Sequence, residues 1–317
     1  MKQPEIIVHN ELTDDNQDFV TGKFCAPIFI CDQNGTLLKR DNELLAKENN
    51  YPNIRNGTLT FIKYNDVIYG ITCRHVVEAL NKYNEINKKH WLDNYHVSGQ
   101  LPDVAQMHFF IPKNEYQIHI NSDFYFIRGD EFTNEYPDIA ITVIDRNVLK
   151  LSNRVPIDIQ DVDNNFIINS DTENMGAIAV GYPELLREIG DTNTNLISEL
   201  KISVVNIVAN IASVTSNKVR LLSELREVDP KVNNLSGMSG GPILGTNEER
   251  WGLIGIITQA RDIQPKNDSF FTEPTVWIEG EKIDIKLLES WITAIPKIFN
   301  FKQSLTKCLY MPSNFKG

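Results

Sequence analysis

The chain has 317 residues, and its 31 Lys and Arg residues against 42 Asp and Glu residues give a formal net charge of −11. This acidic balance argues against a nucleic-acid-binding protein, because phosphate recognition normally needs a basic face or stripe. Hydrophobic residues make up 41% of the chain and charged residues 23%, close to the average of soluble domains, which argues against disorder over most of the chain.

The cysteines and the distribution of apolar residues indicate the cellular compartment in which the protein is expected. The chain contains no CxxC pair, which argues against a disulfide framework or a zinc ribbon and fits a reducing compartment. The first residues lack an apolar core of signal-peptide length, and no stretch of about 18 apolar residues occurs. We therefore expect a cytoplasmic protein that binds neither a membrane nor a nucleic acid. The cysteines are Cys25, Cys31, Cys73 and Cys308.

The first half of the chain is rich in strand and turn signals. A short buried strand is expected over 24–31, and the run 57–76 predicts a β-hairpin that turns at Tyr64-Asn65-Asp66. The next segment, 77–89, has the pattern of a short helix. A polar excursion follows, with one strand expected over 107–111.

Short strands separated by Gly, Asn, Asp and Pro continue after the midpoint, without regular amphipathic helices between them. This pattern indicates an all-β barrel or sandwich rather than a parallel α/β sheet. Near the C-terminus the spacing becomes helical over 283–299, and Pro296 limits the run. We expect that helix to pack on the β body. The expected strands are 139–144, 177–181, 201–212, 218–222, 241–244 and 251–258.

Three short motifs carry residues of catalytic type. TCRHVV places His75 just after a predicted strand, YPDIAI places Asp138 just before one, and NLSGMSGGP places Ser239 in a glycine-rich turn. A serine hydroxyl needs a base to become a nucleophile, and histidine suits that task near neutral pH. An aspartate on the far ring nitrogen orients the imidazole, and amides of a glycine-rich turn can face a developing oxyanion.

These motifs resemble those of the chymotrypsin/trypsin-like serine peptidases, whose triad runs His, Asp, Ser and ends in GxSGGP. The resemblance covers roughly residues 55–260 and implies two antiparallel six-stranded β-barrels, with the C-terminal helix added. It implies catalytic roles for His75, Asp138 and Ser239, an oxyanion hole from the amides of Gly237 and Ser239, a polypeptide substrate, and neither cofactor nor metal. Substrate-binding positions by the same resemblance are Asn233, Ile256, Ile257 and Thr258.

The chain departs from the secreted branch of that family at Met238, where an aspartate would serve zymogen activation. The resemblance is therefore closer to intracellular and bacterial members, and we hypothesise that activity depends on a protein partner or on a disordered cleft loop. The expected organisation is an N-terminal extension with a first strand (1–50), a peptidase domain (51–265) with an insertion within 81–125, and a C-terminal tail carrying the helix (266–317).

Several alternatives stay open at this stage. Asp145 is the other candidate acid, although it follows a strand and lacks the motif, and Glu224, Glu227 or Asp229 could supply a specificity acid in place of Asn233. A protease-fold binding or scaffold protein with a latent or inactive site is one rival function, and an acyl-ester hydrolase is another. The histidines between His90 and His119 lack the spacing of a zinc site, and Cys73 is interpreted as a packed strand residue.

Overall fold

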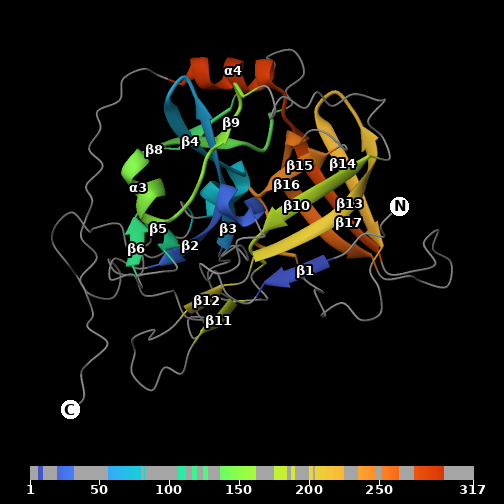
Figure 1. The fold of residues 1–317 in the computed structure, drawn as a ribbon, viewed down its shortest axis with the longest axis horizontal. Helices are drawn as coiled ribbons and strands as arrows, with labels where there is room; N and C mark the ends of the chain where they lie inside the picture. The colour runs from blue at the N-terminus through green and yellow to red at the C-terminus, as the bar shows by residue number, and fades with distance from the viewer. Residues whose placement is uncertain are drawn as a thin grey trace.

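A computed structural model describes this chain over residues 6–9, 20–31, 56–79, 82, 106–111, 116–119, 124–127, 136–161, 175–183, 187–189, 200–202, 204–224, 235–246, 251–263 and 275–295. Most of these residues lie in strands of two sheets that pack side by side (Figure 1). The prediction of a mainly β protein is confirmed. No helix within the described ranges is long and apolar enough to cross a membrane.

The first sheet contains eight strands in the order β6-β5-β2-β3-β4-β8-β7, with β9 parallel to β3. The expected hairpin forms between β3 and β4. It turns at Asn65 and Asp66, which have φ values of 45° and 64° and so give the left-handed turn that matches the twist of paired strands. The strands are β2 (Cys25–Cys31), β3 (Asn56–Tyr64), β4 (Val67–Thr72), β5 (Gln106–Ile111), β6 (Tyr116–His119), β7 (Tyr125–Phe126), β8 (Ala140–Ile144) and β9 (Ile157–Asp158).

The second sheet closes into a barrel. Its strands pair in the order β13-β10-β15-β16-β17-β14, and β14 pairs back onto β13, which makes a closed ring of six strands. A seventh strand, β1, adds to the outside of β13. The bounds are β1 (Ile6–His9), β10 (Gly176–Gly181), β13 (Val204–Val214), β14 (Lys218–Glu224), β15 (Pro242–Thr246), β16 (Trp251–Ile263) and β17 (Thr275–Lys282), and a separate pair consists of β11 (Arg187–Ile189) and β12 (Leu200–Ile202).

Of the two closed barrels expected by resemblance, the described residues show one. Only the second sheet closes in the described residues, whereas the first has the ends β6 and β7 of its strand order unpaired with each other. The barrel also extends past the predicted domain boundary at 265, because β17 lies at 275–282 and supplies one of its six strands. At the other end, β2 falls within the predicted extension 1–50 yet pairs with both β3 and β5.

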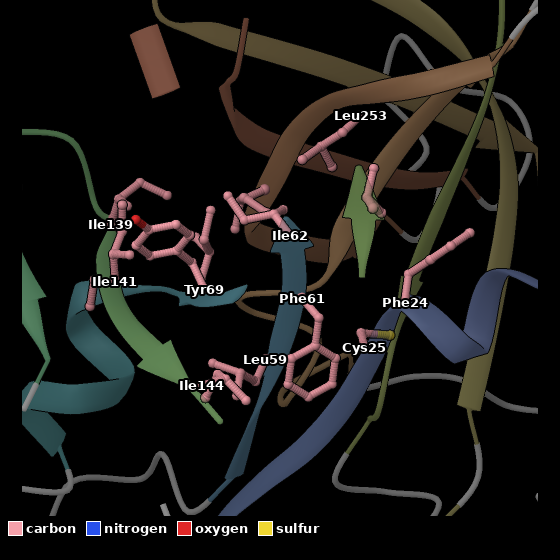
Figure 2. Packing of buried hydrophobic residues seen from close by; sticks show 14 of the residues in the cluster. Phe24, Cys25, Leu59, Phe61, Ile62, Tyr69, Ile139, Ile141, Ile144 and Leu253 are labelled. Atoms are coloured by element: carbon pink, nitrogen blue, oxygen red, sulfur yellow. The ribbon is translucent and has the colours of Figure 1, made fainter. Parts of the chain in front are cut away.

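Two apolar clusters fill the structure. One lies inside the barrel and includes Ile207, Leu221 and Ile254, all essentially inaccessible to solvent. The other covers the first sheet and also receives side chains from the barrel, so that Ile62 of β3 and Leu253 of β16 belong to the same cluster (Figure 2). The two sheets therefore share one apolar interface, along which a site can be built from both.

The expected C-terminal helix is α4, Ile285–Ala294. Asp284 caps its N-terminus by accepting a hydrogen bond from the Leu287 amide at 2.9 Å, and the chain leaves the helix at Ile295, whose extended ψ of 127° is typical of a residue before proline. Trp291 and two neighbouring apolar residues pack into the cluster of the first sheet. After β17 the chain thus passes from the barrel into α4, which packs on the first sheet near β4 (Figure 1).

The other helical segments are short. Residues 74–79 are helical, so the helix expected over 77–89 begins three residues earlier, and most of its remainder lies outside the described residues. A short 3-10 helix, η1 (Val20–Phe24), precedes β2, and α3 (Arg146–Leu151) was not predicted. Asp145 caps α3 by accepting from the Asn147 amide at 2.7 Å. Asp145, the other candidate for the catalytic acid, therefore has a structural role as the N-cap of α3.

Candidate functional site

His75 and Asp138 are brought together by the pairing of β4 with β8. Thr72, the last residue of β4, lies opposite Ala140, the first residue of β8, so the segment that follows β4 lies beside the segment that precedes β8. His75 Nδ1 lies 2.5 Å from Asp138 Oδ2, and the His75 main-chain amide donates to Asp138 Oδ1 at 3.0 Å. Because a carboxylate only accepts hydrogen bonds, this contact places the ring proton on Nδ1 and leaves Nε2 as the basic atom.

The pair is accessible to solvent. About 31% of the His75 side chain and 30% of the Asp138 side chain are exposed, unlike the neighbouring Cys73, which is fully buried. The Arg74 amide also donates to the Asp138 carbonyl at 3.3 Å. Asp138 is therefore held to the His75 segment at both its side chain and its main chain, with the imidazole open on one side.

Ser239 lies in a turn, 235–241, whose backbone favours glycine at two positions. Gly237 has a φ of 100° and Gly240 a φ of 92°, a region that other residues enter at a cost of about 1–2 kcal/mol. Space is also lacking: a Cβ on Gly240 would lie 2.0 Å from the Thr58 carbonyl oxygen. The glycines of GMSGGP thus let this turn pass directly against β3.

Strand β3 holds the turn through a series of hydrogen bonds that sequence reasoning did not identify. The Thr58 amide donates to the Ser239 carbonyl at 2.8 Å, and the Thr58 hydroxyl donates to the Gly237 carbonyl at 2.9 Å. The Thr60 hydroxyl donates to the Gly240 carbonyl at 2.7 Å. Thr58 and Thr60 are both fully buried. Because β3 also pairs with β4, one hairpin positions both the Ser239 turn and the segment that carries His75.

Two amides of the turn have no acceptor among the described residues. The amides of Met238, Gly240 and Gly241 donate to carbonyls at 2.8–3.2 Å, but none of the recorded hydrogen bonds uses the amides of Gly237 or Ser239. Unpaired amides are rare in folded proteins, particularly at a buried residue such as Gly237. A pair of free N–H groups flanking a serine can stabilise an oxyanion that forms on a substrate carbonyl.

The Ser239 hydroxyl donates to the Thr258 carbonyl at 3.3 Å, and no recorded hydrogen bond within the described residues joins it to His75. Thr258 lies at an irregularity of β16, where the register against β17 shifts between Ile257 and Gln259. Such bulges re-aim backbone groups next to functional sites. In this conformation the hydroxyl of Ser239 is therefore hydrogen-bonded to the main chain of β16.

The predicted substrate-binding residues have different positions. Asn233 lies outside the described residues. The side chains of Ile256 and Ile257 are fully buried, one in each apolar cluster, and the Ile257 carbonyl already accepts from the Gly240 amide at 2.8 Å. Thr258 is partly exposed beside Ser239. The Thr258 hydroxyl donates to the Glu279 carbonyl at 3.2 Å.

Cys73 lies close to the pair and could be mistaken for part of a metal site. Candidate ligand atoms of Cys73, His75 and Asp138 lie within 4.8 Å of one another. The thiol, however, donates to the Ile257 carbonyl at 3.0 Å, and burial raises the pKa of Cys73 well above its usual value, with the Asp138 charge adding to the effect. Nδ1 of His75 is bonded to Asp138. These contacts describe an imidazole–carboxylate pair beside a neutral thiol, which is a poor metal ligand.

We expect Cys73 to resist alkylation in the folded protein. Its thiol is buried and protonated, and alkylation requires an exposed thiolate. After iodoacetamide treatment at pH 8, peptide mass spectrometry should find Cys73 unmodified, whereas the same treatment in denaturant should modify it fully. Rapid modification of Cys73 under native conditions would contradict this description of the site.

Comparisons with known proteins give little further guidance. No family model matches the chain, and no curated protein matches it by sequence. One similar solved structure is the serine protease domain of the Sesbania mosaic virus polyprotein, at 10% identity and a TM-score of 0.36, covering 84% of this chain and 91% of that one. Another, described by the aromatic interactions that drive coupled folding and binding of the intrinsically disordered Sesbania mosaic virus VPg protein, has 11% identity and a TM-score of 0.35, covering 82% and 92%. Similarity at this level assigns neither a family nor an activity.

Proposed function

We propose that this chain is a serine endopeptidase that hydrolyses peptide bonds through an acyl-enzyme on Ser239. The single observation that carries the proposal is the 2.5 Å contact between His75 Nδ1 and Asp138 Oδ2, next to the β3–β4 hairpin. Strand β3 of that hairpin also binds the Ser239 turn, in which the amides of Gly237 and Ser239 have no acceptor among the described residues. Base, orienting acid, nucleophile and oxyanion donors are the parts that acyl transfer requires.

In the proposed reaction, His75 Nε2 accepts the Ser239 hydroxyl proton as Oγ attacks the substrate carbonyl carbon. The amides of Gly237 and Ser239 bind the resulting oxyanion. His75 then donates that proton to the leaving nitrogen as the C–N bond breaks, which gives an amine product and an ester on Ser239. His75 next takes a proton from water, which attacks the ester carbonyl carbon. As the bond from that carbon to Oγ breaks, His75 returns the proton to Oγ, which releases a carboxylic acid and restores the Ser239 hydroxyl. Asp138 keeps the proton on Nδ1 and stabilises the imidazolium during both steps.

The hydrogen bond from Ser239 to the Thr258 carbonyl supports a second candidate, a protease-fold protein in which the site is latent. In that case the hydroxyl turns from Thr258 toward His75 only when a substrate or an activating protein partner binds. The missing zymogen switch at Met238 is consistent with control by a partner rather than by cleavage of the chain. A binding protein that never assembles the site is the limiting form of this alternative.

Peptide cleavage separates these functions. The purified chain and its Ser239→Ala variant are incubated with a peptide library and, separately, with an activated ester, and products are identified by mass spectrometry. The proposal predicts new peptide termini and ester hydrolysis, both absent with Ser239→Ala. Hydrolysis of the ester alone would instead indicate an acyl-ester hydrolase, and the absence of both activities would contradict a constitutively active peptidase.

A further inference from the structure

Asp138 is held from both sheets. Its carboxylate and its carbonyl contact the His75 segment, but its main-chain amide donates in another direction, to Oε1 of Glu281 at 3.0 Å. Glu281 lies near the end of β17, in the closed barrel, 143 residues further along the chain. Within the described residues, this is the hydrogen bond that joins Asp138 to the barrel.

Glu281 is buried, and its charge is balanced. Only 4% of the residue is exposed, and Oε1 lies 2.6 Å from Lys218 Nζ. Lys218 begins β14 and lies directly opposite Glu281 in the pairing of β14 with β17. A buried carboxylate is costly unless it is paired, so the lysine allows Glu281 to stay charged beneath the Asp138 amide. A charged acceptor also makes a stronger hydrogen bond than a neutral one.

The strand that carries Glu281, β17, pairs with β16, and β16 is hydrogen-bonded to the Ser239 turn. Glu281 lies opposite Ile256 of β16, and the carbonyl of the next residue, Ile257, accepts from the Gly240 amide beside Ser239. Glu281 therefore connects the His75–Asp138 pair to the part of the barrel that fixes Ser239. We propose that Glu281, supported by Lys218, is a positioning residue that sets the place of Asp138 and His75 relative to Ser239.

The kinetic test of this inference rests on the proposed function. It compares two variants of Glu281, one that shortens the side chain and one that removes its charge. Glu281→Asp keeps the charge but draws the carboxylate back by one methylene, so the contact with the Asp138 amide is lost. Glu281→Gln keeps an oxygen at the same reach without the charge. Because a misplacement of about 1 Å can cost about 100-fold, we expect Glu281→Asp to lower kcat by about 10- to 100-fold, with KM changing much less. Glu281→Gln should keep kcat within about threefold, because an amide oxygen still accepts the hydrogen bond.

Glu279 provides matched controls on the same strand. Its carboxylate pairs with Arg220 Nε at 2.7 Å, across the same two strands, but it makes no recorded contact with Asp138. Glu279→Asp and Glu279→Gln should therefore leave kcat within about twofold of the wild type, as for a partly exposed ion pair. Equal kcat values for Glu281→Asp and Glu279→Asp would overturn the inference.

A second readout does not depend on hydrolysis. The proton between His75 Nδ1 and Asp138 should give a proton NMR signal far downfield, as expected for a short imidazole–carboxylate hydrogen bond. We expect Glu281→Asp to shift or broaden this signal, and Glu281→Gln and Glu279→Asp to leave it in place. If the wild type hydrolyses no peptide but the signal still responds to Glu281→Asp alone, the proposed function fails and the positioning role stands. A signal identical in Glu281→Asp and Glu279→Asp contradicts the positioning role, whatever the activity.

Discussion

Replacing Asp138 by asparagine should lower kcat about 10⁴-fold while leaving the fold unchanged. The asparagine oxygen can take the place of Oδ1 and accept from the His75 main-chain amide, as the aspartate does at 3.0 Å. The side-chain NH2 then takes the place of Oδ2, 2.5 Å from Nδ1, where it must donate. Nδ1 becomes the acceptor and the ring proton moves to Nε2, so His75 can no longer accept the Ser239 proton.

Asp145→Asn provides the matched control. Asp145 caps α3 through the Asn147 amide, and asparagine caps helices about as well as aspartate. Hydrolysis rates of the two variants and the wild type, with circular dichroism to verify folding, test the assignment of the acid. An Asp138→Asn variant with near wild-type activity, or an Asp145→Asn variant that loses it, would show that the orienting carboxylate is misassigned.

Gly240→Ala should destabilise the protein by about 4 kcal/mol or more, which is at the exceptional end for single substitutions. Alanine at a φ of 92° is strained, and its Cβ would overlap the Thr58 carbonyl oxygen at 2.0 Å and the Thr72 hydroxyl at 2.4 Å. Thr58 cannot retreat easily, because its amide and hydroxyl both bind the turn. Relief of the overlap must displace the turn, and with it Ser239.

Equilibrium unfolding in urea measures this loss, with Gly22→Ala as control. Gly22 is also buried, but an added Cβ there would meet only the Val204 side chain at 3.6 Å, an ordinary contact distance. We expect Gly22→Ala to stay within about 1 kcal/mol of the wild type, since no backbone strain is introduced. If the two variants had equal unfolding free energies, the turn could not be packed on β3 as described.

Local patterns in the sequence predict the elements that depend on local interactions. The hairpin between β3 and β4 follows from β-rich runs around Asn65-Asp66, and α4 follows from helical spacing that ends before Pro296. The three catalytic motifs likewise name His75, Asp138 and Ser239 directly. The structure adds the 2.5 Å contact between the first two residues, while the catalytic role of all three stays a prediction.

Contacts between segments that are far apart in the sequence could not be predicted from local patterns. β17 was missed because it lies in a segment interpreted as a tail, and its place in the barrel depends on pairing with β14 more than 50 residues away. The buried hydroxyls of Thr58 and Thr60 look like ordinary strand threonines until the Ser239 turn, about 180 residues away, is packed against them. Closure of the second sheet likewise depends on strands that are far apart in the sequence, since β10 pairs with β15 and β14 with β17.

Covalent labelling by a fluorophosphonate, followed by intact-mass spectrometry, tests the assembled site most directly. The reagent requires an activated serine and a base, but no particular peptide substrate. The wild type should gain one adduct, located on Ser239, and both Ser239→Ala and His75→Ala should remain unlabelled although folded. A folded wild type that gains no adduct, or an adduct that persists in Ser239→Ala, would contradict an assembled nucleophilic site built from Ser239, His75 and Asp138.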